Sequence, residues 1–259
     1  MRKTVVAMSL LGLLMMSGCG GSSEKAGKAP ETTAGGAPGL TPDAANGATV
    51  SGKINFTGPK PVLRDIDMSA NPACQKIHPK PVPSEEVIVN SDGTLANAFV
   101  WVKSGVPEGK WAAPSTPSVV DQKGCIYTPH VSGVVVGQPV EFRNSDDTNH
   151  NIHPLPRQNQ EWNESQPPKG EPKTKTFDQE EVMVPVKCNI HPWMRAYIGV
   201  VRHPFFAVTG ADGTFKIAGL PPGKYTVEAW HERFGRQETE VTVAAKDSKS
   251  VDFSFATKK

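Results

Sequence analysis

Short runs of β-branched and aromatic residues, each broken by glycine, proline, asparagine or aspartate, recur along this 259-residue chain. Clear examples lie at 49–56, 98–102 and 134–136. Runs of this length between turn residues predict strands, and stretches with the helical period are hard to find. Glycine and proline number 24 each, which is above average but below the range of disordered chains. The sequence therefore predicts an all-β fold.

Residues 1–18 predict a signal peptide. Arg2 and Lys3 precede an apolar stretch that is too short to span a membrane comfortably. The following Met-Ser-Gly-Cys at 16–19 resembles a bacterial lipobox. That resemblance implies a lipoprotein, cleaved before Cys19 and lipidated on its thiol, outside the cytoplasm and facing the periplasm or the cell exterior. An ordinary cleaved signal with an incidental cysteine is the alternative.

Residues 19–47 have almost no large apolar side chains and are rich in Gly, Ala, Ser, Thr, Pro and Lys. Such a segment buries too little surface to offset its chain entropy, so we expect a disordered tether. The remaining residues suffice for one large or two small domains. The net charge is +2, from 28 basic and 26 acidic residues, which argues against nucleic acid as a partner.

Residues 188–194 read Cys-Asn-Ile-His-Pro-Trp-Met and place a thiolate, an imidazole and a thioether close together. His150, upstream on an expected strand end, is a second source of imidazole. Two His, one Cys and a weak axial Met are the ligands of a blue-copper site. Thiolate and thioether favour Cu(I), and imidazole accepts both oxidation states. These residues predict one copper ion that passes single electrons.

The alternatives concern the identity of the metal and of the upstream ligand. Zinc is the main rival, but it prefers four strong ligands and a thioether is a poor one. His153 competes with His150 for the upstream position. An offset of three residues places the two on opposite faces of a continuous strand. His130 has no ligand partner nearby in the sequence and is expected to be structural or at the surface, although a second metal site there stays open.

The cysteines can be assigned by compartment. With Cys19 given to lipid and Cys188 to metal, Cys74 and Cys125 are left, and an exported protein can oxidise them. We predict a disulfide between Cys74 and Cys125. The alternatives are two separate buried thiols, or a second metal site that uses one of them together with His78.

Three segments resemble the cupredoxin family, specifically the plastocyanin and amicyanin type. They are Gly-Gln-Pro-Val-Glu-Phe-Arg-Asn at 137–144, His-Asn-Ile at 150–152 and Cys-x2-His-x2-Met at 188–194. The match covers residues 112–203 and implies a Greek-key β-sandwich. It also implies that His150, Cys188 and His191 are the trigonal copper ligands and that Met194 is the long axial one.

The same resemblance implies roles for the neighbours of the ligands. Asn151 and Asn189 flank the ligands and are expected to hydrogen-bond across the site. Pro192 and Trp193 are expected to surround an exposed edge of His191, where electrons enter and leave, with ordinary loop packing as the alternative. The expected partner is a redox protein such as a cytochrome or an oxidoreductase.

The tail resembles the carboxypeptidase regulatory-like domain, a transthyretin-like β-sandwich. Asp-Gly at 212–213 and Pro-Pro-Gly at 221–223 make its turns, and apolar residues alternate between them. An early strand of that family fits residues 50–54. The expected order is therefore early strands and a connection at 48–111, an inserted cupredoxin domain at 112–203, and late strands at 204–259.

No catalytic motif stands out. The sequence has no Gly-x-Ser-x-Gly, no His-Glu-x-x-His and no phosphate-cradling loop, and its seven His form no His-x-His pair. We therefore expect a membrane-tethered electron carrier rather than an enzyme. A copper-binding or copper-delivery lipoprotein is one alternative, and a binding module with a structural metal is another.

Overall fold

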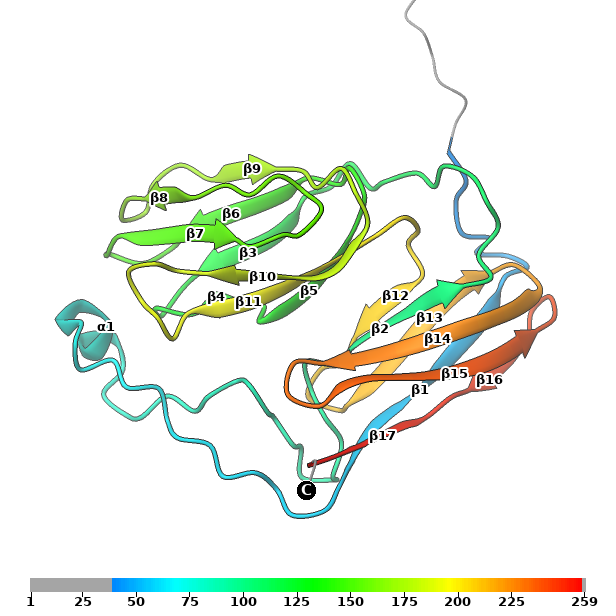
Figure 1. The fold of residues 1–259 in the computed structure, drawn as a ribbon, viewed down its shortest axis with the longest axis horizontal. Helices are drawn as coiled ribbons and strands as arrows, with labels where there is room; N and C mark the ends of the chain where they lie inside the picture. Colours follow the sequence, from blue (N-terminus) through cyan, green and yellow to red (C-terminus); the bar gives the residue numbers. More distant parts are fainter. Residues whose placement is uncertain (1–38, 258–259) are drawn as a thin grey trace, which may run out of the picture. The chain divides into compact units, whose positions relative to one another are not determined.

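The computed structural model describes residues 39–257, and the regular secondary structure of this part is almost entirely β (Figure 1). It contains seventeen strands and one short helix, α1 (Pro72–Ile77). The predicted all-β fold class is confirmed. The predicted signal peptide and the lipidation of Cys19 lie outside the described residues. Within 39–257, no helix is both long enough and apolar enough to cross a membrane.

Two sheets enclose the core that contains the predicted metal ligands. Their strand orders are β5-β11-β10-β7-β8 and β4-β3-β6-β9. In β6 alternate residues, such as Val140 and Phe142, are fully buried between the sheets. The bounds are β3 (Ser118–Gln122), β4 (Tyr127–Thr128), β5 (Val131–Val135), β6 (Val140–Asn144), β7 (His150–Pro154), β8 (Glu164–Gln166), β9 (Lys173–Lys175), β10 (Glu181–Lys187) and β11 (Arg195–Val201).

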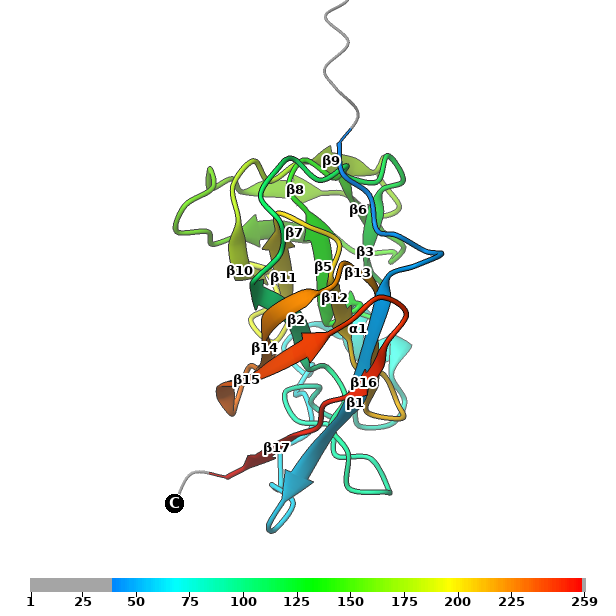
Figure 2. The same ribbon diagram turned by 90° about the vertical axis from the view of Figure 1, so that its right-hand side faces the viewer.

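Two further sheets enclose a second apolar core. In one, β1 pairs with β13, β16 and β17, so the start and the end of the described chain share a sheet. The other has the order β12-β2-β14-β15. Figure 2 shows β1 in blue beside β16 in red. The bounds are β1 (Ala48–Thr57), β2 (Phe99–Ser104), β12 (Phe206–Val208), β13 (Thr214–Leu220), β14 (Gly223–His231), β15 (Gly235–Val243), β16 (Ser248–Ser250) and β17 (Phe253–Ala256).

Two glycines permit a close contact between β-strands of the two cores. Phe99 and Phe206 stack with ring centroids 5.7 Å apart in a cluster that includes residues of β2 and β11. A Cβ placed on Gly199 would lie 2.4 Å from the Phe99 ring, and one on Gly133 would lie 2.4 Å from the Phe206 ring. Both positions therefore require glycine for these rings to pack where they do.

The connection between β1 and β2 contains one short helix and little other regular structure. Residues 59–84 contain α1, which Asn71 caps and Pro72 begins. Residues 87–89 form only one bridge, Val89 to Leu95, next to the tight turn at 90–93.

The predicted tether extends too far into the folded part. Leu40 N donates to Lys110 O at 2.8 Å, and Asp43 N donates to Gly219 O at 3.2 Å. The prediction of disorder is wrong for residues 39–47, because their backbone groups pair with the rest of the fold. The remaining part of the predicted tether, 19–38, lies outside the described residues.

A buried ion pair provides a pH test of stability. His130 and Glu232 are in contact, with side chains 6% and 8% exposed. Burial alone would lower the pKa of His130, but the hydrogen bond to Glu232 and the charges of Glu232 and Glu85 raise it above its ordinary value. Because the folded pKa is the higher one, the pair stabilises fully below the ordinary His pKa. This contribution is lost as pH rises through the folded pKa.

As the pH rises through the folded pKa of His130, we expect the free energy of unfolding to fall by about 1.5–3 kcal/mol. This is the range for a hydrogen bond to a charged group. His130→Gln should lack this pH-dependent loss. The measurement is urea unfolding of both proteins at pH values from below the ordinary His pKa to above the raised pKa of the folded protein. Parallel pH profiles for the two proteins would contradict the assignment.

Candidate metal centre

One tight loop holds three of the predicted ligands. β10 ends directly before Cys188, β11 begins directly after Met194, and the two strands pair antiparallel. Cys188 N donates to Met194 O at 3.2 Å, and Met194 N donates to His191 O at 2.9 Å. The paired strands and these two bonds fix the loop at one end of the sheet.

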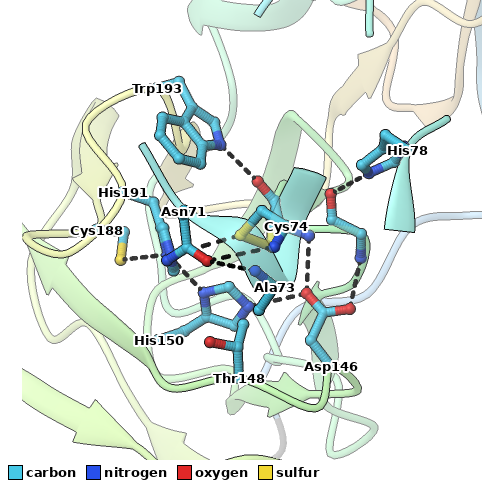
Figure 3. Close-up of a disulfide and its surroundings, with 12 residues drawn as sticks. Asn71, Ala73, Cys74, His78, Asp146, Thr148, His150, Cys188, His191 and Trp193 are labelled. Carbon is cyan, nitrogen blue, oxygen red and sulfur yellow. Dashed lines mark hydrogen bonds and ion pairs between the residues drawn. A yellow bond between two sulfur atoms is a disulfide. The ribbon is translucent and has the colours of Figure 1, made fainter. Parts of the chain in front are cut away.

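The fourth predicted ligand comes from the neighbouring strand. His150 begins β7, which pairs antiparallel with β10. The Nδ1 atoms of His150 and His191 lie 3.0 Å apart, and Cys188 Sγ lies 3.7 Å from His191 Nδ1 (Figure 3). All three residues are buried and offer ligand atoms within 4.8 Å of one another. Met194 is buried in the same core cluster as Cys188.

The donors in this cluster suit a metal ion of intermediate softness. Two imidazole nitrogens and one thiolate are strong ligands for copper or zinc, and carboxylate-preferring ions such as Mg²⁺ and Ca²⁺ are disfavoured. A second group, Cys125 with Asp146 and His150, also has its possible ligand atoms within 4.8 Å of one another. Cys125 is disulfide-bonded, so its sulfur cannot act as a thiolate ligand. The cluster of His150, Cys188 and His191 is therefore the candidate site.

Asp146 supports this cluster, although the sequence interpretation did not single it out. Its Oδ2 accepts from His150 Nε2 at 2.8 Å and from Cys125 N at 2.7 Å, and its Oδ1 accepts from Gly124 N at 2.7 Å. The carboxylate holds the His150 proton on Nε2 and leaves the Nδ1 lone pair free. The sequence signal that could have identified Asp146 is a polar turn at 145–149 with an aspartate four residues before His150.

The electrostatics favour the metal-binding protonation state at His191 and Cys188 but not at His150. Burial and the nearby charge of His150 lower the pKa of His191 to about 4, so its imidazole is neutral at neutral pH. Burial alone would raise the pKa of the Cys188 thiol, but the adjacent His150 side chain and hydrogen bonds from backbone N–H groups lower it. For His150, burial opposes the hydrogen bonds to Asp146 and Cys188, which raise its pKa. A metal ion at His150 Nδ1 would therefore compete with a second proton on the ring.

The predicted neighbours of the ligands hold the loop. Asn189 N donates to Asn151 Oδ1 at 3.0 Å. His153 Nδ1 lies 3.1 Å from Asn189 Oδ1, and its Nε2 lies 2.6 Å from Glu161 Oε1. The structure therefore places His153 beside the loop as a support, apart from the cluster of ligand atoms.

Cys74 and Cys125 are joined by a disulfide. His78, the other residue considered with Cys74, has its Nε2 2.7 Å from Gly124 O. In the described part of the chain, neither of the two groups of possible metal ligands includes His78, His130 or His153.

The expected exposed edge of His191 is absent. His191 has 0% of its surface exposed. Its Nε2 lies 2.7 Å from Asn71 Nδ2 and 3.5 Å from Cys74 Sγ (Figure 3). Pro192 is exposed, whereas Trp193 is half-buried and donates from Nε1 to Cys125 O at 2.9 Å. The expectation of exposure is wrong because the β1–β2 connection folds back over the imidazole.

Asp146→Asn tests the support of His150. An amide has one acceptor oxygen, so its NH2 group must face either His150 Nε2–H or a backbone N–H of the turn at 124–125. We expect a loss of about 1–3 kcal/mol in unfolding free energy and a 10- to 100-fold (order of magnitude) weaker metal affinity. Urea unfolding and a metal titration measure the two effects, and unchanged affinity would contradict the role of Asp146.

Comparison with known proteins gives one family match. Residues 195–256 match the carboxypeptidase regulatory-like domain, which confirms the resemblance of the tail. This range begins with β11, the strand that follows the ligand loop. No curated protein matches the chain.

Several solved structures show partial likeness. A Cu-containing nitrite reductase from Thermus scotoductus is 26% identical, with 38% of this chain and 25% of that chain covered and a TM-score of 0.31. A purple cupredoxin from Nitrosopumilus maritimus is 20% identical, with coverage of 32% and 98% and a TM-score of 0.28. A mutant of amicyanin in its Cu(I) form is 23% identical, with coverage of 39% and 97% and a TM-score of 0.30. The chain thus spans a quarter of the nitrite reductase chain.

Proposed function

We propose that this protein carries single electrons through one type 1 copper ion held by His150, Cys188, His191 and Met194. The observation that supports this most strongly is the convergence of two imidazole Nδ1 atoms and one thiol in a buried cluster. A copper ion bound there supplies a one-electron Cu(II)/Cu(I) couple. Thiolate and imidazole ligands with a weak thioether suit both oxidation states.

The surroundings of the ligands favour electron transfer over a flexible site. His150 is fixed by Asp146, and the loop is closed by backbone hydrogen bonds between Cys188, His191 and Met194. Ligands held in this way change position little between oxidation states, which lowers the reorganisation that slows electron transfer. The same three strong donors would also bind zinc. Zinc has no redox couple, however, and a thioether such as Met194 is a poor ligand for it.

The setting of the protein is part of the proposal. A lipid on Cys19 would anchor the chain to a bacterial membrane with the folded part outside the cytoplasm. Electrons would be exchanged with a redox protein such as a cytochrome. The carboxypeptidase regulatory-like part would be an accessory sandwich, and its fold alone assigns it no activity.

One observation favours a second candidate, copper delivery. The imidazole edge of His191 is fully covered, which lengthens the path for direct electron exchange with a partner. A protein that binds and hands over copper can use the same ligands without fast electron transfer.

The two candidates differ in kinetics. For an electron carrier, mixing the Cu(II)-loaded protein with a reduced soluble cytochrome should oxidise one equivalent of the cytochrome quickly, while a copper chelator removes the metal slowly. Fast loss of copper to the chelator with no oxidation of the cytochrome would overturn electron transfer in favour of delivery. Stopped-flow absorbance follows both reactions.

A further inference from the structure

Asn71 contacts both the helix that covers the site and a proposed ligand. Its Oδ1 accepts from Ala73 N at 3.1 Å and from Cys74 N at 3.2 Å, and so caps α1. Its Nδ2 lies 2.7 Å from His191 Nε2 (Figure 3). Because the oxygen is committed to the helix, the NH2 group must face the imidazole. His191 Nε2 must then be an acceptor.

The same direction of hydrogen-bond donation continues from His191 through His150 to Asp146. With Nε2 accepting, neutral His191 has its proton on Nδ1, which lies 3.0 Å from His150 Nδ1 and donates to it. His150 then has its proton on Nε2 and donates to Asp146 Oδ2 at 2.8 Å. Each donor in the chain from Asn71 to Asp146 meets an acceptor, so the arrangement is self-consistent without a metal ion.

A metal ligand at His191 Nδ1 requires the opposite polarity at the Asn71 end. The Nδ1 lone pair must be free, so the proton of the neutral ring resides on Nε2. Two donors, Nε2–H and the amide NH2, would then face each other at 2.7 Å. Turning the amide over would set its NH2 group against the N–H groups of Ala73 and Cys74. The disulfide sulfur of Cys74, 3.5 Å away, is only a weak acceptor.

We propose that Asn71 is a positioning residue that holds α1 closed over His191 only while His191 binds no metal ion. This inference rests on the metal site proposed above. Loading the site breaks the Asn71–His191 contact, while the bond from His150 to Asp146 is kept. The disulfide between Cys74 and Cys125 keeps α1 nearby. The first turn of α1 therefore loosens locally and uncovers the imidazole edge in the loaded protein.

Two substitutions separate the cap from the imidazole contact. Asn71→Asp has two acceptor oxygens, so one can cap α1 while the other accepts from His191 Nε2–H. Asn71→Ser also caps the helix, but its hydroxyl is too short to reach His191 as well. Both remove the opposing NH2 group, so both should bind Cu(I) more tightly than the wild type. A merely structural role for Asn71 predicts unchanged or weaker binding instead.

The experiment uses Cu(I), which is diamagnetic, without oxygen. Imidazole ¹⁵N NMR of the metal-free wild type should show His191 protonated on Nδ1. Hydrogen exchange at Ala73 and Cys74 should accelerate on Cu(I) loading by about tenfold, the equivalent of one lost hydrogen bond of about 1.4 kcal/mol. In Asn71→Asp the exchange should stay slow after loading. In Asn71→Ser it should be the same with and without Cu(I).

The possible failures are distinguishable. Binding of Cu(I) with unchanged exchange at Ala73 and Cys74 in the wild type would overturn the inference and leave the metal site standing. An NMR spectrum of the metal-free protein that shows His191 protonated on Nε2 would also overturn the inference and leave the metal site standing. Failure of the wild type to bind Cu(I) at all would overturn the inference together with the proposed function.

Discussion

Replacing Cys188 with alanine is expected to abolish stoichiometric copper binding while the fold is retained. Cys188 supplies the only thiolate among the converging ligand atoms, and its lowered pKa favours the metal-binding form. The two imidazoles and the thioether that remain form a much weaker site, because the soft thiolate contributes most to binding Cu(I). Copper content after dialysis and circular dichroism measure the two parts of this prediction.

The matched control is Ile190→Ala in the same loop. Ile190 is 46% exposed and offers no ligand atom, so its replacement should leave one copper per protein. Retention of one tightly bound copper by the Cys188→Ala protein would contradict the ligand assignment. Loss of copper in the Ile190 variant would show that the loop, rather than the thiolate, controls binding.

Removing the disulfide, by Cys74→Ala together with Cys125→Ala, should cause the largest loss of stability. The bond closes a loop with a sequence separation of 51 residues. Chain entropy predicts a stabilisation of about 4 kcal/mol for a loop of this size, and measured values usually lie at or below such predictions. The bond is also the covalent link that holds α1 beside the ligand loop. Urea unfolding of the double variant, monitored by tryptophan fluorescence, gives the difference.

The wild-type protein treated with a dithiol reductant is the comparison for the double variant. Both should unfold at a similar, lower urea concentration, and both should still bind one copper ion, since neither cysteine is a proposed ligand. A loss in unfolding free energy below about 1 kcal/mol would contradict a stabilising role for the disulfide. Loss of copper from both would implicate the disulfide in the site itself.

The all-β fold could be predicted from the sequence because strand signals are local. Alternation over a few residues places Phe215 and Ile217 in a core whatever the rest of the chain does. The ligand loop was recognisable for a similar reason, since Cys188, His191 and Met194 lie within one turn between two strands.

The features that were missed depend on contacts between distant segments. The six residues of α1 are too few to show helical periodicity, although Asn71 followed by Pro72 is a start signal. Nothing in the sequence near His191 indicates that Asn71, 120 residues earlier, covers its ring. Asp146 is closer to its partner, but an aspartate in a polar turn is common, and only the fold directs it at His150.

The most direct test is one visible and EPR spectrum of the protein loaded with one equivalent of Cu(II). A thiolate bound to Cu(II) together with two imidazoles should give intense visible absorption by charge transfer from sulfur and a small copper hyperfine splitting. A colourless Cu(II) protein with the large hyperfine splitting of nitrogen and oxygen ligands would contradict a type 1 site formed by His150, Cys188, His191 and Met194.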